Sequence, residues 1–93
     1  MKIRVSCEDK YEAQKLASLI FIKEANETFI TSILNIVENE LVVSLKDKSA
    51  HSVILKDRVH AEIFADFIQS VIDKEHRIIS TAILEHDVEI AKG

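Results

Sequence analysis

The residues of this sequence whose types could do chemistry are few and widely spaced. Cys7 is the lone cysteine, so no intramolecular disulfide and no multi-cysteine metal site can form. His60 is followed two positions later by Glu62, but the Cys-x-x-Cys that accompanies the His-x-Glu of zinc deaminases is absent. Cys7 and His60 are therefore single candidates for nucleophilic or acid–base chemistry, without a surrounding motif.

Both candidates also have a structural interpretation. Cys7 ends an alternating apolar run, which favours packing in the core. The N-terminus of a following helix could lower the pKa of its thiol, whereas Glu8 and Asp9 favour the neutral form. His60 falls on the apolar stripe of an expected helix, where it is either an acid–base group or ligand in a half-buried site, or a histidine satisfied by a backbone group.

Glu85, His86 and Asp87 place three metal-capable residues in a row. On a strand, His86 would point to the opposite face from its two neighbours. On a helix, successive side chains would diverge by about 100°. These residues could hold an ion only if His51 or His76 joined them through the fold, so no metal site and no cofactor are predicted.

An acidic stripe is expected if the same segment is a strand, since Glu85, Asp87 and Glu89 would then share a face. Such a stripe either protects an edge strand from aggregation or docks a basic partner. We include the three residues in the predicted protein interface.

The composition predicts one small acidic domain over residues 1–93. The net charge is −4, and Ile, Val, Leu and Phe make up 33 of the 93 residues. Without interior glycine, no phosphate-cradling loop is expected, and without a basic run, no nucleic-acid partner is expected. The N-terminus lacks a signal-peptide core, and the longest apolar run, residues 19–22, cannot span a membrane. We therefore expect a cytoplasmic protein without a membrane partner, and no internal repeat is evident.

Apolar periodicity predicts most of the elements. Residues 2–7 alternate as a half-buried strand, and a helix follows to about Ala25, with Asn26 as its C-terminal cap. Residues 51–56 could add a short strand. Residues 57–75 form the clearest helix, with Asp57 as its N-cap.

The stretch NIVENELVV predicts a hairpin that turns at Glu38 and Asn39 without glycine. Asn39 is expected to adopt positive φ, which asparagine tolerates better than other non-glycine residues. One register sorts the two strands by face, pairing Ile36 with Leu41, Leu34 with Val43 and Ser32 with Leu45. After the second helix, residues 77–84 favour a strand, whereas residues 85–92 fit a strand, a helix or a loose tail.

The expected order, β-α-β-β-(β)-α-β, favours an α+β domain in which two helices cover one face of a single antiparallel sheet, the ferredoxin-like sandwich. In layout alone, this order of elements is loosely similar to that of the small dimerising subunit of the KEOPS tRNA-modification complex.

The surplus of apolar residues predicts a contact surface. Phe29, Ile33 and Val37 would lie on the open face of the sheet, joined by Ile79 and Ile83. The alternative is that the two faces are reversed and Ile33 belongs to the core.

These observations favour a small non-enzymatic protein-interaction module, which would act as a regulator, adaptor or inhibitor of phage or bacterial type. It would dock a protein partner through an apolar sheet face or edge. One alternative is a homodimeric structural subunit of a larger assembly. Another is a small enzyme or ligand-binding domain that uses Cys7 or His60.

Overall fold

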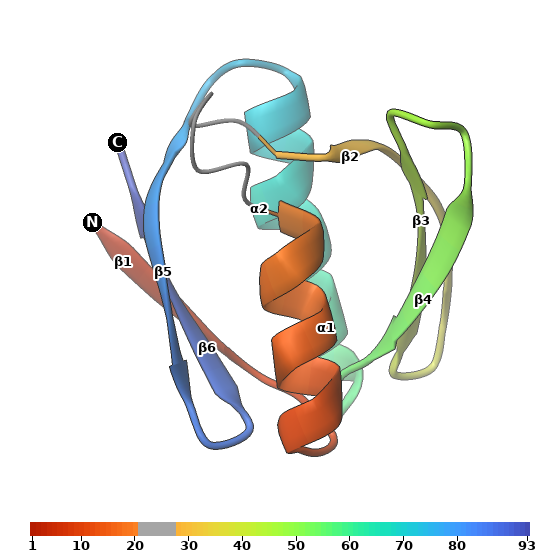
Figure 1. Ribbon diagram of the computed structural model, residues 1–93, viewed down its shortest axis with the longest axis vertical. Coiled ribbons are helices and arrows are strands. Elements are labelled where there is room, and N and C mark those ends of the chain that lie inside the picture. Colours follow the sequence, from red (N-terminus) through yellow and green to blue (C-terminus); the bar gives the residue numbers. More distant parts are fainter. Residues whose placement is uncertain (21–27) are drawn as a thin grey trace.

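The computed structural model describes residues 1–20 and 28–93 and places two helices between two antiparallel sheets (Figure 1). One sheet has the strand order β1 (Lys2–Ser6), β6 (Asp87–Lys92), β5 (Ile78–Leu84). The other has the order β2 (Ile30–Val37), β3 (Glu40–Leu45), β4 (Ala50–Ile54). The layer between them consists of α1 (Lys10–Ile20) and α2 (Arg58–Ile72).

The α+β class is confirmed, but the single sheet of the ferredoxin-like sandwich is not, because the described strands divide into two sheets. The difference arises in residues 85–92, which turn back and form β6. Since β6 pairs with β5 on one side and with β1 on the other, β1 joins the C-terminal hairpin and not the central one. Asn26, the expected cap of the first helix, lies outside the described residues.

The same four elements occur twice along the chain, which the sequence pattern did not indicate. The unit β1-α1-β2-β3 is followed by β4-α2-β5-β6. Few residue types coincide between the two halves. Those that do, at a spacing of 48 positions, include Asp9 with Asp57, Ala13 with Ala61 and Ile20 with Ile68.

Each sheet combines strands from both halves. Val5 of β1 lies opposite Val88 of β6, and Val53 of β4 lies opposite Leu41 of β3. The hairpin of one half is therefore completed by the first strand of the other half, so the two halves are interlocked.

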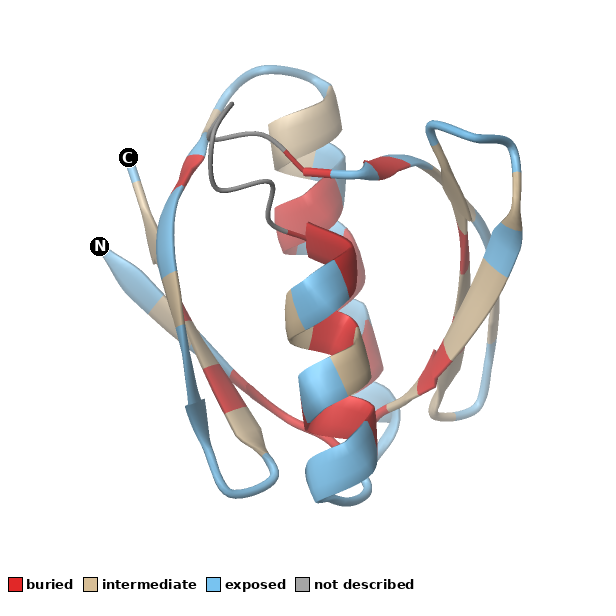
Figure 2. Cartoon of the chain, in the orientation of Figure 1, coloured by how far each residue is buried: buried red, intermediate tan, exposed pale blue. Residues whose placement is uncertain are grey.

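The apolar core lies on both sides of the helical layer, and Figure 2 shows buried segments along the helices and in both sheets. Because sheets flank the helices on two sides, each helix needs more than one apolar stripe. The largest fully buried side chains come from every layer and include Leu16, Ile20, Leu41, Phe64, Ile68, Ile78 and Ile90.

Equivalent aspartates begin the two helices. Asp57 is the N-cap of α2, as predicted, and its Oδ1 accepts a hydrogen bond of 3.0 Å from the backbone N–H of His60. Asp9 Oδ1 accepts one of 2.9 Å from the backbone N–H of Glu12. Each carboxylate satisfies a donor that the first helical turn leaves unpaired.

The predicted turn at Glu38 and Asn39 is confirmed, but Glu38 and not Asn39 adopts positive φ, at 53°. The Asn39 side chain instead donates from Nδ2 to the Leu55 carbonyl at 2.9 Å. Asparagine at this position therefore serves a contact between the two halves. The other residues with positive φ in the described part of the chain are likewise charged: Lys48, Lys74 and Glu85.

The predicted hairpin register holds beside the turn, where Ile36 faces Leu41. Farther along, two register shifts in β2 change it, so that Val43 faces Ile33 and not Leu34, and Leu45 faces Ile30 and not Ser32. Each bulge adds a residue to one strand and moves the following side chains to the other face. As a result, Ile33 packs against the core, whereas Leu34 is 55% exposed.

Candidate interaction surface

The structure divides the predicted interface between two sheets. Phe29 precedes β2 and Val37 ends it, whereas Ile79 and Ile83 lie on β5 in the other sheet. The helical layer separates the two groups (Figure 1). All four side chains are exposed, but they do not form one face.

Ile33 does not join the exposed residues, because it packs against the core. Two exposed leucines that the sequence pattern did not single out are Leu34 and Leu84. The bulges that expose Leu34 leave no clear mark in the sequence. Leu84 could have been found, since it is the last apolar residue before the turn at Glu85.

Asp87 and Glu89 of the acidic stripe are paired with basic residues of β1. The Arg4 guanidinium lies 3.2 Å from a Glu89 carboxylate oxygen, and Lys2 Nζ lies 3.4 Å from the other. The hydrogen bond from Arg4, followed by the Lys2 charge, lowers the pKa of Glu89. These contacts make a charged ladder that joins β1 to β6.

Asp87 is the second acidic member of this ladder, at 4.0 Å from Arg4. A hydrogen bond from the Ser6 hydroxyl is the main cause that lowers the pKa of Asp87, and the nearby His86 and Arg4 act in the same direction. Glu85 lies outside the ladder, in the exposed turn of the hairpin.

The C-terminal ends of β1 and β4 meet beside the N-terminal ends of α1 and α2 (Figure 1). The Ser6 carbonyl accepts a hydrogen bond of 2.8 Å from the Lys56 N–H, and the Ile54 carbonyl accepts one of 3.0 Å from the Glu8 N–H. The outer edges of β1 and β4 are therefore occupied at this end by backbone from the other half.

Two side chains complete this junction from equivalent helix positions. Glu12 Oε2 accepts from the Ile54 N–H at 3.2 Å, and His60 Nδ1 accepts from the Ser6 N–H at 3.0 Å. The hydrogen bond from Ser6 agrees with the interpretation of His60 as a histidine that is satisfied by a backbone group. With Nδ1 acting as the acceptor, the ring is neutral and carries its proton on Nε2.

Cys7 lies beside this junction and is 1% exposed, in a bridge with Leu55. Burial, followed by the charges of Glu12, Asp87 and Asp9, raises the pKa of the Cys7 thiol to about 12. A buried thiol that stays neutral at physiological pH is a packing group and a poor nucleophile.

The histidines that were considered as metal ligands lie apart. His86 Nδ1 lies 3.1 Å from Asp87 Oδ1, while His51 Nε2 lies 2.8 Å from the Ser49 hydroxyl. Within residues 1–20 and 28–93, no three His, Cys, Asp or Glu side chains gather closely enough to hold an ion.

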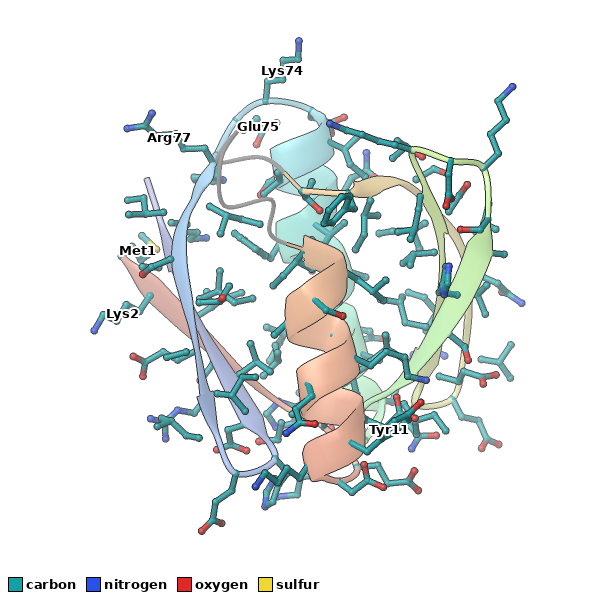
Figure 3. All side chains as sticks on the ribbon, in the orientation of Figure 1. Met1, Lys2, Tyr11, Lys74, Glu75 and Arg77 are labelled. Atoms are coloured by element: carbon teal, nitrogen blue, oxygen red, sulfur yellow. The ribbon has the colours of Figure 1, made fainter. Side chains whose placement is uncertain are left out.

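A cavity of about 730 Å³ opens at the C-terminal end of α2. Its apolar lining includes Ile30, Val71 and Ile78. Lys74 and Arg77 also border it, but Figure 3 shows both side chains extending away from the body of the molecule. Thr28, Glu75 and His76 also line the cavity, and the Nδ1 atom of His76 is buried without a hydrogen-bond partner among the described residues.

The outer edges of β2 and β5 differ in regularity. Among the described residues, neither strand has a neighbour on the side away from its hairpin partner. Two register shifts interrupt β2, whereas β5 has one, between Ile78 and Ser80, so that residues 80–84 pair regularly with β6. Bulges are a common way to protect an edge strand, so β2 is protected between Ile30 and Asn35 and β5 only at its start.

The backbone of β5 presents hydrogen-bonding groups along this edge. The tight turn at residues 85–86 makes Leu84 and Asp87 a hydrogen-bonded pair. Because bonded and non-bonded pairs alternate, Thr81 and Ile83 direct their N–H and C=O groups away from β6.

The sequence of β5, IISTAIL, contains no charged residue. Ile79, Ile83 and Leu84 are 50%, 41% and 48% exposed, respectively. Natural edge strands usually carry charges, prolines or bulges that prevent pairing. A regular, uncharged edge is the geometry that strand addition uses.

Comparisons of this chain with protein-family models, with curated proteins and with solved structures find no match. No described helix is long and apolar enough to cross a membrane. The support for a function therefore comes from the surfaces described above.

Proposed function

We propose that this protein is a non-enzymatic protein-interaction module, a regulator, adaptor or inhibitor that binds its partner through the outer edge of β5. The observation that carries the proposal is the regular, uncharged run of residues 80–84, where Thr81 and Ile83 direct backbone groups outward. In strand addition, such groups supply affinity, and alternating side chains supply specificity. The lone cysteine fits a reducing compartment such as the cytoplasm, where we propose that the protein acts.

A homodimeric structural subunit of a larger assembly is the second candidate. The same observation favours it, because an uncharged strand can pair with its own copy without like-charge repulsion. An activity that uses Cys7 or His60 has less support, since Cys7 is buried with a raised pKa and His60 is engaged as a hydrogen-bond acceptor.

The test replaces one backbone donor at the edge. Thr81→Pro removes an outward N–H, a change that edge strands tolerate and central strands do not. Thr81→Val is the matched control, because it changes the side chain and keeps the N–H. In quantitative affinity capture from extracts of the source cells, a specific partner should be retained by wild type and Thr81→Val and lost by Thr81→Pro.

Circular dichroism should show that all three proteins have the same secondary structure. A partner captured equally well by the Thr81→Pro protein would mean that the β5 edge is not the binding site.

A further inference from the structure

We propose that β5 pairs antiparallel with the β5 strand of a second copy of this chain. The sheet β1-β6-β5 of each copy would then form half of a continuous sheet across the dimer. This inference rests on the proposed function and names the partner that the β5 edge fits.

The outward backbone groups define the register. Thr81 and Ile83 face the free edge, and Ala82 lies between them. Placing Ala82 opposite Ala82 of the second copy sets Thr81 of each chain opposite Ile83 of the other. Each such pair can exchange both N–H···O bonds, and all of these groups lie in the regular part of the strand.

The side chains agree with this register. The two-fold axis passes between two alanines, whose small side chains allow the strands to approach closely. Ser80 of each copy then lies beside Leu84 of the other, and no charged groups oppose each other within the paired segment. A strand that pairs with itself closes a two-fold dimer, so the contact uses up the edge and does not propagate into a fibre.

Charges at the two ends of β5 are complementary under the same two-fold axis. Arg77 precedes the strand and Glu85 follows it. Antiparallel pairing brings Arg77 of each copy to the end where Glu85 of the other copy lies, within about one residue position once the bulge at Ile79 is counted. Arg77 is exposed at this end of β5 (Figure 3). This charge match is what favours a second copy over an unrelated strand.

The first experiment measures the molecular mass of the protein in solution and the hydrogen-exchange protection of the backbone amides at the β5 edge. Light scattering with size exclusion, from about 1 μM to about 1 mM protein, should show a concentration-dependent shift toward twice the 10.6 kDa of the chain. Amide hydrogen exchange by NMR should show that Thr81 and Ile83 gain protection with concentration, whereas Ala82, which bonds to β6, is protected throughout. Thr81→Pro should weaken dimerisation about thirtyfold or more by removing one bond from each copy, and Thr81→Val should not.

The second experiment tests the register. Arg77→Glu alone and Glu85→Arg alone each place like charges together at both ends of the contact, and each should weaken self-association about tenfold. An equimolar mixture of the two variant proteins restores opposite charges at both ends. The mixture should therefore form a heterodimer with near wild-type affinity, which a nonspecific charge effect would not produce.

A wild-type protein that stays monomeric at the highest concentration overturns self-pairing. If that monomer still captures a partner that Thr81→Pro loses, the proposed protein-binding function stands with a different partner. A dimer that Thr81→Pro leaves intact, without added protection at Thr81 and Ile83, also overturns the inference. If the charge mixture fails to associate, the register with Ala82 on the axis is wrong.

Discussion

The two halves of the chain have the same order of elements and differ in how they finish their hairpins. In the first half, two register shifts interrupt β2 and turn Ile33 toward the core. In the second half, β5 has one shift at its start and then runs regularly to Leu84. A shared architecture thus accommodates one protected edge and one open edge, and local irregularity in the strand decides between them.

The junction between the ends of β1 and β4 shows the opposite relation, since different residues there perform the same task. Glu12 and His60 each accept a hydrogen bond from the last residue of the first strand of the other half. Glu12 does so as a buried carboxylate that Lys15 approaches to 3.2 Å, whereas His60 uses a neutral ring nitrogen. The fold requires an acceptor at this point, and the chemistry of the acceptor is free to differ.

The largest expected effect tests the direction of the β2 side chains. Ile33→Asp should destabilise the protein by about 3 kcal/mol or more, because a carboxylate would face the core without a partner. Leu34→Asp, one residue along, should cost little because Leu34 is exposed. Urea unfolding followed by circular dichroism measures both. Similar losses for the two variants would contradict the bulged register.

A smaller effect is expected at the junction. Glu12→Ala and His60→Ala each leave a backbone N–H without its acceptor, at Ile54 and Ser6 respectively, and each should cost about 1–3 kcal/mol. Glu12→Gln and His60→Gln keep an oxygen acceptor and should lose less. Equal unfolding free energies for the alanine and glutamine variants would show that these hydrogen bonds contribute nothing.

The smallest effect is expected in the ladder between β1 and β6. Arg4, then Lys2, lower the pKa of Glu89, so the stability that Glu89 contributes is present above the pKa of an unfolded glutamate. It is lost as the pH falls through the lower pKa of the folded state. Glu89→Gln should therefore flatten the acid side of the stability profile, measured as thermal midpoint against pH. High salt should reduce the difference by screening the exposed pairs. An unchanged acid limb would exclude a contribution from this ladder.

Local patterns predicted what depends on neighbouring residues. The alternation of residues 2–7, the turn at residues 38–39, the Asp57 cap and the second helix are all found in the structure. Each of these signals arises within a few positions, where side-chain periodicity and backbone preference act directly.

The features that the sequence did not reveal depend on distant pairings. Arg4 contacts Glu89 across 85 positions, and Asn39 reaches Leu55. These contacts decide that the acidic stripe is largely neutralised and that asparagine in the turn serves as a donor. The division into two sheets has the same origin, since it follows from the choice of β6 as the partner of β1.

The pairing of β1 with β6 also has a consequence during protein synthesis. Arg4 and Glu89 are 85 positions apart, so at about 5–20 residues per second β1 is synthesised about 4–17 s before its partner strand. During this interval a short β-forming segment has no partner in its own sheet. In the folded protein, Lys2 and Arg4 form ion pairs with Glu89 of β6. Before β6 is made, their positive charges repel the same residues of another nascent chain and so discourage pairing between two β1 strands.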